Sequence, residues 1–169
     1  NYIMDIKNNK RGRISDYIKK YPKAEFKKNK TPWEVKCEIA LPSATQNELN
    51  GDDAKLLIKN GCICVAEGAN MPCNSDAIKT FKFNKVLFAP GKASNAGGVA
   101  VSGLEMAQNS LRYSWSREEV DEKLKEIMIK IHKKCLKHGE TKDYIDYGKG
   151  ANISAFIKVA DAMLAQGVV

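Results

Sequence analysis

Residues 91–103 (GKASNAGGVAVSG) combine small residues with polar side chains in a pattern that could hold a ligand. They follow an apolar run and lead into good helix formers, which predicts a strand, a tight turn and a helix. Asn95, Val99 and Ser102 are spaced at i, i+4 and i+7, which would place them on one face of that helix. This face would offer an amide, an apolar wall and a hydroxyl to the same space.

Three glycines lie in the same expected helix, at Gly97, Gly98 and Gly103. Each glycine inside a helix costs about 1 kcal/mol relative to alanine, so we expect another group to come close to this backbone. The residues alone leave two interpretations open: a bound small molecule, or a glycine-rich crossing of two helices.

Polar loops also follow two other apolar runs that have the character of buried strands. The three loops are residues 43–46, 68–72 and 91–95. In open parallel sheets, ligands bind beyond the carboxyl ends of the strands, so the three loops together form a candidate site.

Two asparagines in these loops, Asn70 and Asn95, are candidate ligand contacts. An amide side chain both donates and accepts hydrogen bonds, which suits a carboxamide or a ribose. For either asparagine alone, a role in a turn or a helix cap is the alternative.

The segments that position these loops alternate between strand and helix character. We expect a short edge strand at 24–26, strands at 35–41, 62–66 and 86–89, a helix at 54–59 capped by Asn50 and followed by Gly61 as its C′ residue, and a helix capped by Ser75 or Asp76 that ends at Phe83. This alternation predicts an α/β fold with a parallel sheet and right-handed crossovers.

After residue 115 the pattern is helical only. Ser116 and Glu119 form a capping-box pair for a helix that Gly139 ends, and Asn152 is the expected cap of the last helix. The expected inner face of that last helix consists of five apolar residues: Ile153, Phe156, Ile157, Ala160 and Leu164.

Charge and hydropathy argue against two classes of partner. The net charge is +8, and residues 1–36 hold 11 basic against 4 acidic side chains. No nucleic-acid motif accompanies this cluster, so a solvated lysine-rich surface is the favoured interpretation. No apolar run approaches the ~20 residues of a membrane span, and no secretory leader is visible, so we expect a cytoplasmic protein.

Cysteine and histidine usage fits the same compartment. Five cysteines without a CxxC motif indicate reduced thiols, and we expect Cys62 and Cys64 to face the same side of one strand. His132 and His138 would lie on different faces of a helix, so no metal site is expected. The chain contains no GxGxxG fingerprint, no Walker loop and no Ser–His–Asp arrangement.

Several long motifs give the chain a resemblance to a known family. The motifs are residues 39–49, 66–72, 87–109, 150–153 and 158–168. They resemble the Glu/Leu/Phe/Val dehydrogenases, and within that family the NADP-dependent, hexameric glutamate dehydrogenases. The likeness covers essentially all 169 residues. It corresponds to about the last two-fifths of such an enzyme, so we expect a longer parent chain that shares this C-terminus.

The resemblance implies a specific fold. Residues 1–94 would be the second half of a Rossmann-like, dinucleotide-binding parallel sheet, and 95–115 a glycine-rich helix along the cleft. Residues 116–169 would be helices that pack back on the substrate domain.

The resemblance also implies roles for the candidate residues. Asn95 would lie beside the nicotinamide ring and Asn70 at its ribose. Val99 and Ser102 would close around the side chain of glutamate, with Ser102 meeting its γ-carboxylate. The loop past the adenosine side of the coenzyme would be formed by Ala44, Thr45 and Gln46.

The implied reaction is the reversible oxidative deamination of L-glutamate to 2-oxoglutarate and ammonia by a homo-hexamer. The coenzyme would be NADP, with NAD as the open alternative. The family's catalytic lysine and aspartate and its glycine fingerprint belong upstream, so this chain holds none of them, and we expect it to be inactive alone. The alternative is a truncated, inactive interaction module of the same fold.

Overall fold

The computed structural model describes residues 1–167; Val168, the last residue of one family-like motif, and Val169 lie outside that range. The chain divides into two compact units, Asn1–Pro32 and Trp33–Val169. In residues 1–167 no helix has the length and apolar character needed to cross a membrane. The three-part division expected from the sequence stays a prediction.

The first unit is a set of short helical turns. These are α1 (Tyr2–Met4), η1 (Asp5–Asn9), η2 (Ile14–Asp16) and α2 (Tyr17–Lys20). Ile6 is its buried residue, and the rings of Tyr17 and Tyr21 stack with their centroids 4.8 Å apart. The expected edge strand at 24–26 is wrong: this segment is a bend and irregular chain, since no strand of the described residues pairs with it.

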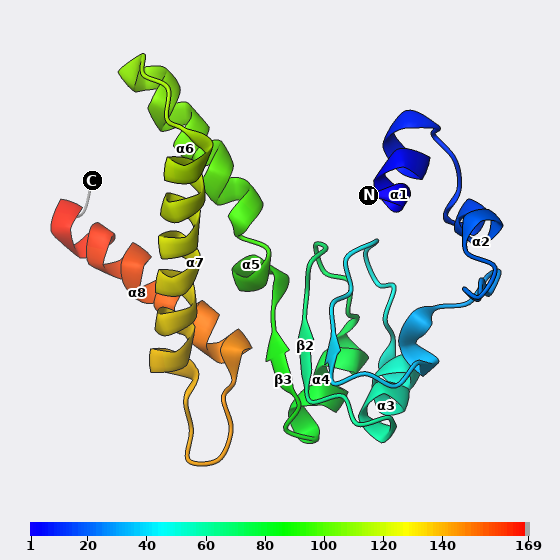
Figure 1. The fold of residues 1–169 in the computed structure, drawn as a ribbon. Coiled ribbons are helices and arrows are strands. Elements are labelled where there is room, and N and C mark those ends of the chain that lie inside the picture. Colours follow the sequence, from blue (N-terminus) through cyan, green and yellow to red (C-terminus); the bar gives the residue numbers. More distant parts are fainter. Residues whose placement is uncertain (168–169) are drawn as a thin grey trace. The chain divides into compact units, whose positions relative to one another are not determined.

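The second unit contains a three-stranded parallel sheet in the order β1-β2-β3, shown in Figure 1. Its strands are β1 (Ile39–Ala40), β2 (Cys64–Ala66) and β3 (Leu87–Ala89). Ile39 pairs with Cys64, which in turn pairs with Leu87. The predicted parallel α/β arrangement is therefore confirmed, with strands shorter than the apolar runs suggested.

Each crossover between strands is a short helix. The 3₁₀ turn η3 (Pro32–Glu34) precedes the sheet, α3 (Gly51–Lys59) connects β1 to β2, and α4 (Ser75–Phe83) connects β2 to β3. Gly61 has φ +89°, as its expected C′ position requires.

Side-chain caps begin both crossover helices. Asn50 Oδ1 accepts from the amides of Asp52 and Asp53, as predicted. The cap of α4 is Asn74, which accepts from Ala77 N at 2.9 Å, so the predicted caps at Ser75 and Asp76 are wrong. Asn74 is the cap because its backbone is extended, whereas Ser75 and Asp76 already have helical geometry.

The hydrophobic core lies between one face of the sheet and helices α3 and α4. Its fully buried side chains include Leu57, Val65 and Phe81, and the Phe81 ring stacks on Phe88. Cys62 belongs to this core, whereas Cys64 lines a cavity of about 300 Å³ on the other side, bounded by helices α7 and α8. The expectation that both cysteines face one side is wrong, because β2 begins only at Cys64 and the alternation does not extend back to Cys62.

Four helices follow the sheet. They are α5 (Gly91–Ser94), α6 (Gly97–Leu111), α7 (Arg117–Gly139) and α8 (Tyr147–Gln166). The Ser116–Glu119 capping box and the end at Gly139 are confirmed. Helix α8 begins five residues before Asn152, because Asp146 caps it by accepting from Lys149 N at 2.9 Å; the cap predicted at Asn152 is wrong.

Helices α7 and α8 cross with their backbones in contact, as Figure 1 shows near the start of α8. A Cβ atom on Gly150 would lie 2.0 Å from the carbonyl oxygen of Cys135, and one on Gly139 would lie 2.4 Å from that of Asp146. Only hydrogen atoms fit at these two positions, so the glycines set how closely the helices pack.

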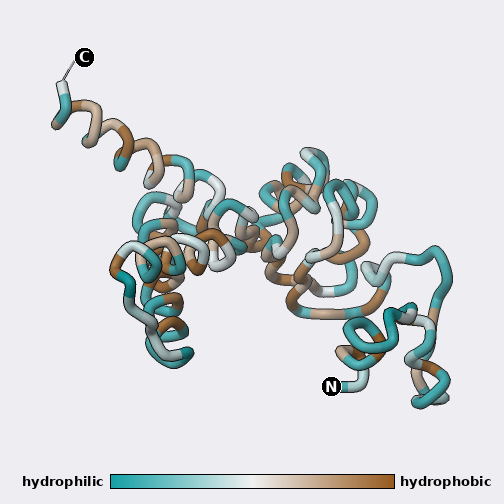
Figure 2. The backbone as a smooth tube through the Cα atoms, turned by 90° about the horizontal axis from the view of Figure 1, so that it is seen from above, coloured by the Kyte–Doolittle hydropathy of each residue, from teal (hydrophilic) through white to brown (hydrophobic). Residues whose placement is uncertain are grey.

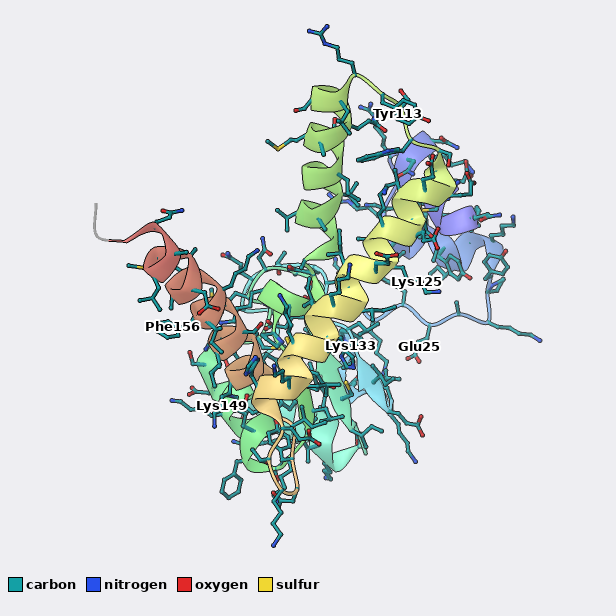
Figure 3. All side chains as sticks on the ribbon, turned by 90° about the vertical axis from the view of Figure 1, so that its left-hand side faces the viewer. Glu25, Tyr113, Lys125, Lys133, Lys149 and Phe156 are labelled. Carbon is teal, nitrogen blue, oxygen red and sulfur yellow. The ribbon has the colours of Figure 1, made fainter. Side chains whose placement is uncertain are left out.

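Most of α8 beyond this crossing is exposed. Phe156 is 72% and Leu164 81% exposed, and Figure 3 shows Phe156 on the side of α8 away from α7. Hydrophobic residues recur along the free length of this helix in Figure 2. The inner face expected from its apolar spacing is therefore wrong for most of its residues within the described chain: Ile153 and Ala160 are half-buried, whereas Phe156, Ile157 and Leu164 are exposed.

Gly150→Ala should destabilise the protein by about 1–3 kcal/mol, the usual range for forcing an extra methyl into close packing. Gly103→Ala is the matched control, since nothing described lies within 4 Å of a Cβ there. That change should be neutral or stabilising by up to about 1 kcal/mol through helix propensity. Urea unfolding of the chain measures both; equal effects of the two changes would contradict the close crossing.

Candidate functional site

The three predicted polar loops meet at the carboxyl edge of the sheet. Gly68 N donates to the carbonyl of Pro42 at 2.9 Å, and Asn47 N donates to the carbonyl of Met71 at 3.0 Å. The first and second loops are thus joined through their backbones, as the expected parallel order requires.

Glycines allow the loops to approach one another. A Cβ on Gly68 would lie 2.2 Å from Ser43 Oγ, and a Cβ on Gly91 would lie 3.0 Å from the carbonyl oxygen of Ala69. Gly68 is therefore needed between the first and second loops, and Gly91 between the second and third.

The two predicted asparagines are brought together. Asn95 Nδ2 donates to Asn70 Oδ1 at 2.9 Å and to the carbonyl of Ala69 at 3.1 Å. Asn70 is exposed and Asn95 partly so, which leaves this amide pair accessible from solvent. The pair joins the second loop to the third.

Glu67 completes this loop cluster, and the sequence analysis missed it. Its Oε2 accepts from Gly91 N at 2.6 Å and its Oε1 from Cys73 N at 3.2 Å. Burial raises the pKa of the Cys73 thiol, and the nearby Glu67 carboxylate raises it further, so this thiol stays protonated. A glutamate directly after a buried strand and before a glycine is the one sequence signal that could have identified it.

The predicted adenosine-side residues lie on the first loop. Ala44, Thr45 and Gln46 are all exposed, and Ala44 N donates to Glu48 Oε1 at 2.8 Å. Among residues 1–167 no direct hydrogen bond connects these three to the Asn70–Asn95 pair. They share the sheet edge with the pair, in keeping with an extended ligand.

The predicted single helical face is only partly formed. Asn95 lies between α5 and α6, so it shares no helix with Val99 and Ser102. Those two residues lie one turn apart near the start of α6, where Val99 is 74% exposed and Ser102 Oγ donates to the Gly98 carbonyl at 3.4 Å. The break lies at Asn95, which is the C-cap of α5 and whose side-chain amide bonds to the second loop.

The glycines of α6 divide between the two interpretations left open by the sequence. A Cβ on Gly97 would meet Leu124 and Met128 of α7 at 3.6 and 3.8 Å, which is a helix crossing. Gly98 and Gly103 have nothing of the described chain within 4 Å of such a Cβ. Their surfaces remain open to another molecule.

Over residues 1–167, no group of three or more His, Cys, Asp or Glu side chains is placed to hold a metal ion. The donors that the loops offer are amides, hydroxyls and backbone groups, which suit a polar organic ligand.

A parallel sheet with polar, glycine-tightened loops at its carboxyl edge is part of a Rossmann-like α/β fold. The family model for Glutamate/Leucine/Phenylalanine/Valine dehydrogenase matches residues 1–167. The chain therefore belongs to this family, and the match confirms the resemblance that its motifs indicate.

Individual relatives agree with the family. The chain is 59% identical over 169 residues to a glutamate dehydrogenase of Bacteroides thetaiotaomicron. The aligned region covers 99% of this chain and 38% of that protein. It is 56% identical over 168 residues to an NADP-specific glutamate dehydrogenase of Haemophilus influenzae, and this alignment covers 98% of this chain and 37% of that protein. The crystal structure of Plasmodium falciparum glutamate dehydrogenase superimposes with a TM-score of 0.94 at 50% identity, covering 99% of this chain and 36% of that one. The chain thus spans little more than a third of the length of its relatives.

Gly68→Ala should push the first and second loops apart, because its methyl would overlap Ser43 Oγ. We expect a loss of about 1–3 kcal/mol in the free energy of unfolding. Adding Ser43→Gly should recover most of that loss by removing the opposing side chain. Denaturant unfolding of the two single variants and the double variant measures the coupling; strictly additive effects would contradict the contact.

Proposed function

We propose that this chain is the C-terminal, coenzyme-side part of an NADP-dependent glutamate dehydrogenase. The observation that carries the proposal is the Asn70–Asn95 amide pair at the carboxyl edge of the sheet, within a chain 59% identical to a glutamate dehydrogenase. The parent enzyme would catalyse the reversible oxidative deamination of L-glutamate to 2-oxoglutarate and ammonia.

The loop chemistry fits the coenzyme. The amide pair offers both donors and acceptors to a carboxamide or ribose, and Gly68 and Gly91 let the loops that carry it lie close together. When bound, the nicotinamide supplies the hydride chemistry, while the protein orients it. Ala44, Thr45 and Gln46 would line the adenosine side. A relative named NADP-specific at 56% identity supports NADP, and one named NAD-specific at 53% identity makes NAD the second candidate.

The exposed start of α6 would form one wall of the glutamate site. Val99 would contact the aliphatic part of the substrate, and the Ser102 hydroxyl would donate to its γ-carboxylate. The open backbone surfaces of Gly98 and Gly103 leave space for the substrate beside this wall. Such a site joins substrate and coenzyme at the junction of α5 and α6.

The remaining machinery would come from the rest of the parent. The catalytic lysine and aspartate and the first half of the coenzyme domain are assigned there. We place the parent in the cytoplasm as a homo-hexamer; the five free cysteines of this chain suit a reducing compartment.

In the full-length parent, Asn95→Ala should raise the KM for the coenzyme about tenfold, and Ser102→Ala should raise the KM for glutamate by a similar factor. Each change removes one polar partner of its ligand, which is worth about 1–3 kcal/mol. The two variants serve as controls for each other in steady-state assays. An unchanged glutamate KM in Ser102→Ala would remove that residue from the substrate site.

The 169-residue chain alone should form no NADPH from glutamate and NADP. It offers one wall of the substrate pocket and part of the coenzyme site, but no group assigned to proton transfer. Absorbance at the NADPH band, with the full-length parent as positive control, measures this. Turnover by the chain alone would overturn the assignment of catalysis to the remainder of the parent.

A further inference from the structure

Glu67 is the one charged side chain that the fold buries among residues 1–167, with 5% of its surface exposed. It lies at the carboxyl end of the sheet, directly after β2. Taking a carboxylate out of water is unfavourable unless hydrogen bonds replace the water, so its burial depends on the donors around it.

The donors come from two different loops. Gly91 N, at the start of the third loop, donates to Oε2 at 2.6 Å, and Cys73 N, just after the second loop, donates to Oε1 at 3.2 Å. Each oxygen therefore serves one backbone amide. A carboxylate suits this arrangement because it accepts at both oxygens, whereas a glutamine would turn its NH₂ group toward one of the two N–H donors.

The same contacts reach the amide pair. A Cβ built on Gly91 would lie 3.4 Å from Glu67 Oε2 and 3.3 Å from Asn95 Nδ2, so both side chains lie close to the same glycine. Asn95 N donates to the Gly91 carbonyl at 2.8 Å, and Ser94 Oγ donates to the Glu67 carbonyl at 2.6 Å. A shift of the carboxylate would therefore shift Gly91 and the asparagine anchored to it.

We propose that Glu67 is a positioning residue of the coenzyme site. Its carboxylate holds the second and third loops together, and thereby places the Asn70–Asn95 pair for the nicotinamide end of the coenzyme. Glu67 itself acts from beneath the loops and makes no contact with the ligand. This inference rests on the proposed function, because that function assigns the amide pair to the coenzyme.

The test uses the full-length parent enzyme with Glu67→Gln, which keeps the shape of the side chain and removes one acceptor. We expect the Kd for NADPH, measured by fluorescence titration, to rise about tenfold or more, the effect of losing one charge-assisted hydrogen bond. Hydrogen exchange should become faster in the segments that contain Gly91 and Cys73. At saturating coenzyme, kcat should change less than the coenzyme KM.

Two further variants separate positioning from general stability. Phe81→Leu disturbs a fully buried ring in α4, far from the loops. The Phe81 carbonyl accepts a hydrogen bond from Val86 N at the amino end of β3, whereas the loops lie at the carboxyl ends of the strands. This variant should lower the unfolding temperature yet leave the NADPH Kd unchanged. Glu67→Asp keeps the charge and both acceptors, so its Kd should fall between those of the wild type and Glu67→Gln, and it replaces Glu67→Gln if that variant does not fold.

Wild-type-like NADPH affinity and exchange in Glu67→Gln, or in Glu67→Asp if it alone folds, would overturn the positioning role while the proposed function stands. An equal loss of affinity in Phe81→Leu would overturn it as well, by assigning the effect to stability. If the wild-type parent neither binds NADPH nor forms it from glutamate, the proposed function fails, and the positioning role fails with it.

Discussion

The parallel pairing of three strands is the constraint on which the candidate site depends. Because Ile39, Cys64 and Leu87 lie in register, the strands end side by side, although their loops are separated by whole crossovers in the sequence. Neighbouring strands are about 4.8 Å apart, so the loops that follow them have little room. Gly68 and Gly91 suit that spacing, since a Cβ atom at either position would lie very close to an atom of the neighbouring loop. The buried packing of α3 and α4 then fixes the edge from below.

Periodicity was enough to predict the order of elements but not their limits. The alternation of apolar runs and capped helices identifies the parallel sheet, because each crossover needs a helix of that length. Caps were harder to predict: Asn74, Ser75 and Asp76 are all suitable side chains, and only the backbone angle at Asn74 decides among them. Asp146 rather than Asn152 caps α8 although two glycines follow, because close packing on α7 offsets their poor helix propensity.

The site shows the same division between local and tertiary information. Loops at strand ends can be found from sequence, and Asn70 and Asn95 stand out as amides in such loops. Glu67 carries a weaker signal, since a glutamate between a buried strand and a glycine resembles a surface residue until the fold brings two amides to its oxygens. The spacing of Asn95 and Ser102 predicts one continuous helix, but Asn95 is the C-cap of α5 and its side chain bonds to the second loop. Gly97 likewise serves a helix crossing that local sequence cannot distinguish from a ligand contact.

The crossing of α7 and α8 at Gly139 and Gly150 has a consequence for the substitutions that these two helices can tolerate. Backbone atoms meet at the crossing itself, and the stacked rings of His132 and Tyr147 lie beside it. The outer surfaces of the two helices can therefore change, while the two glycines keep the direction of α8 relative to α7.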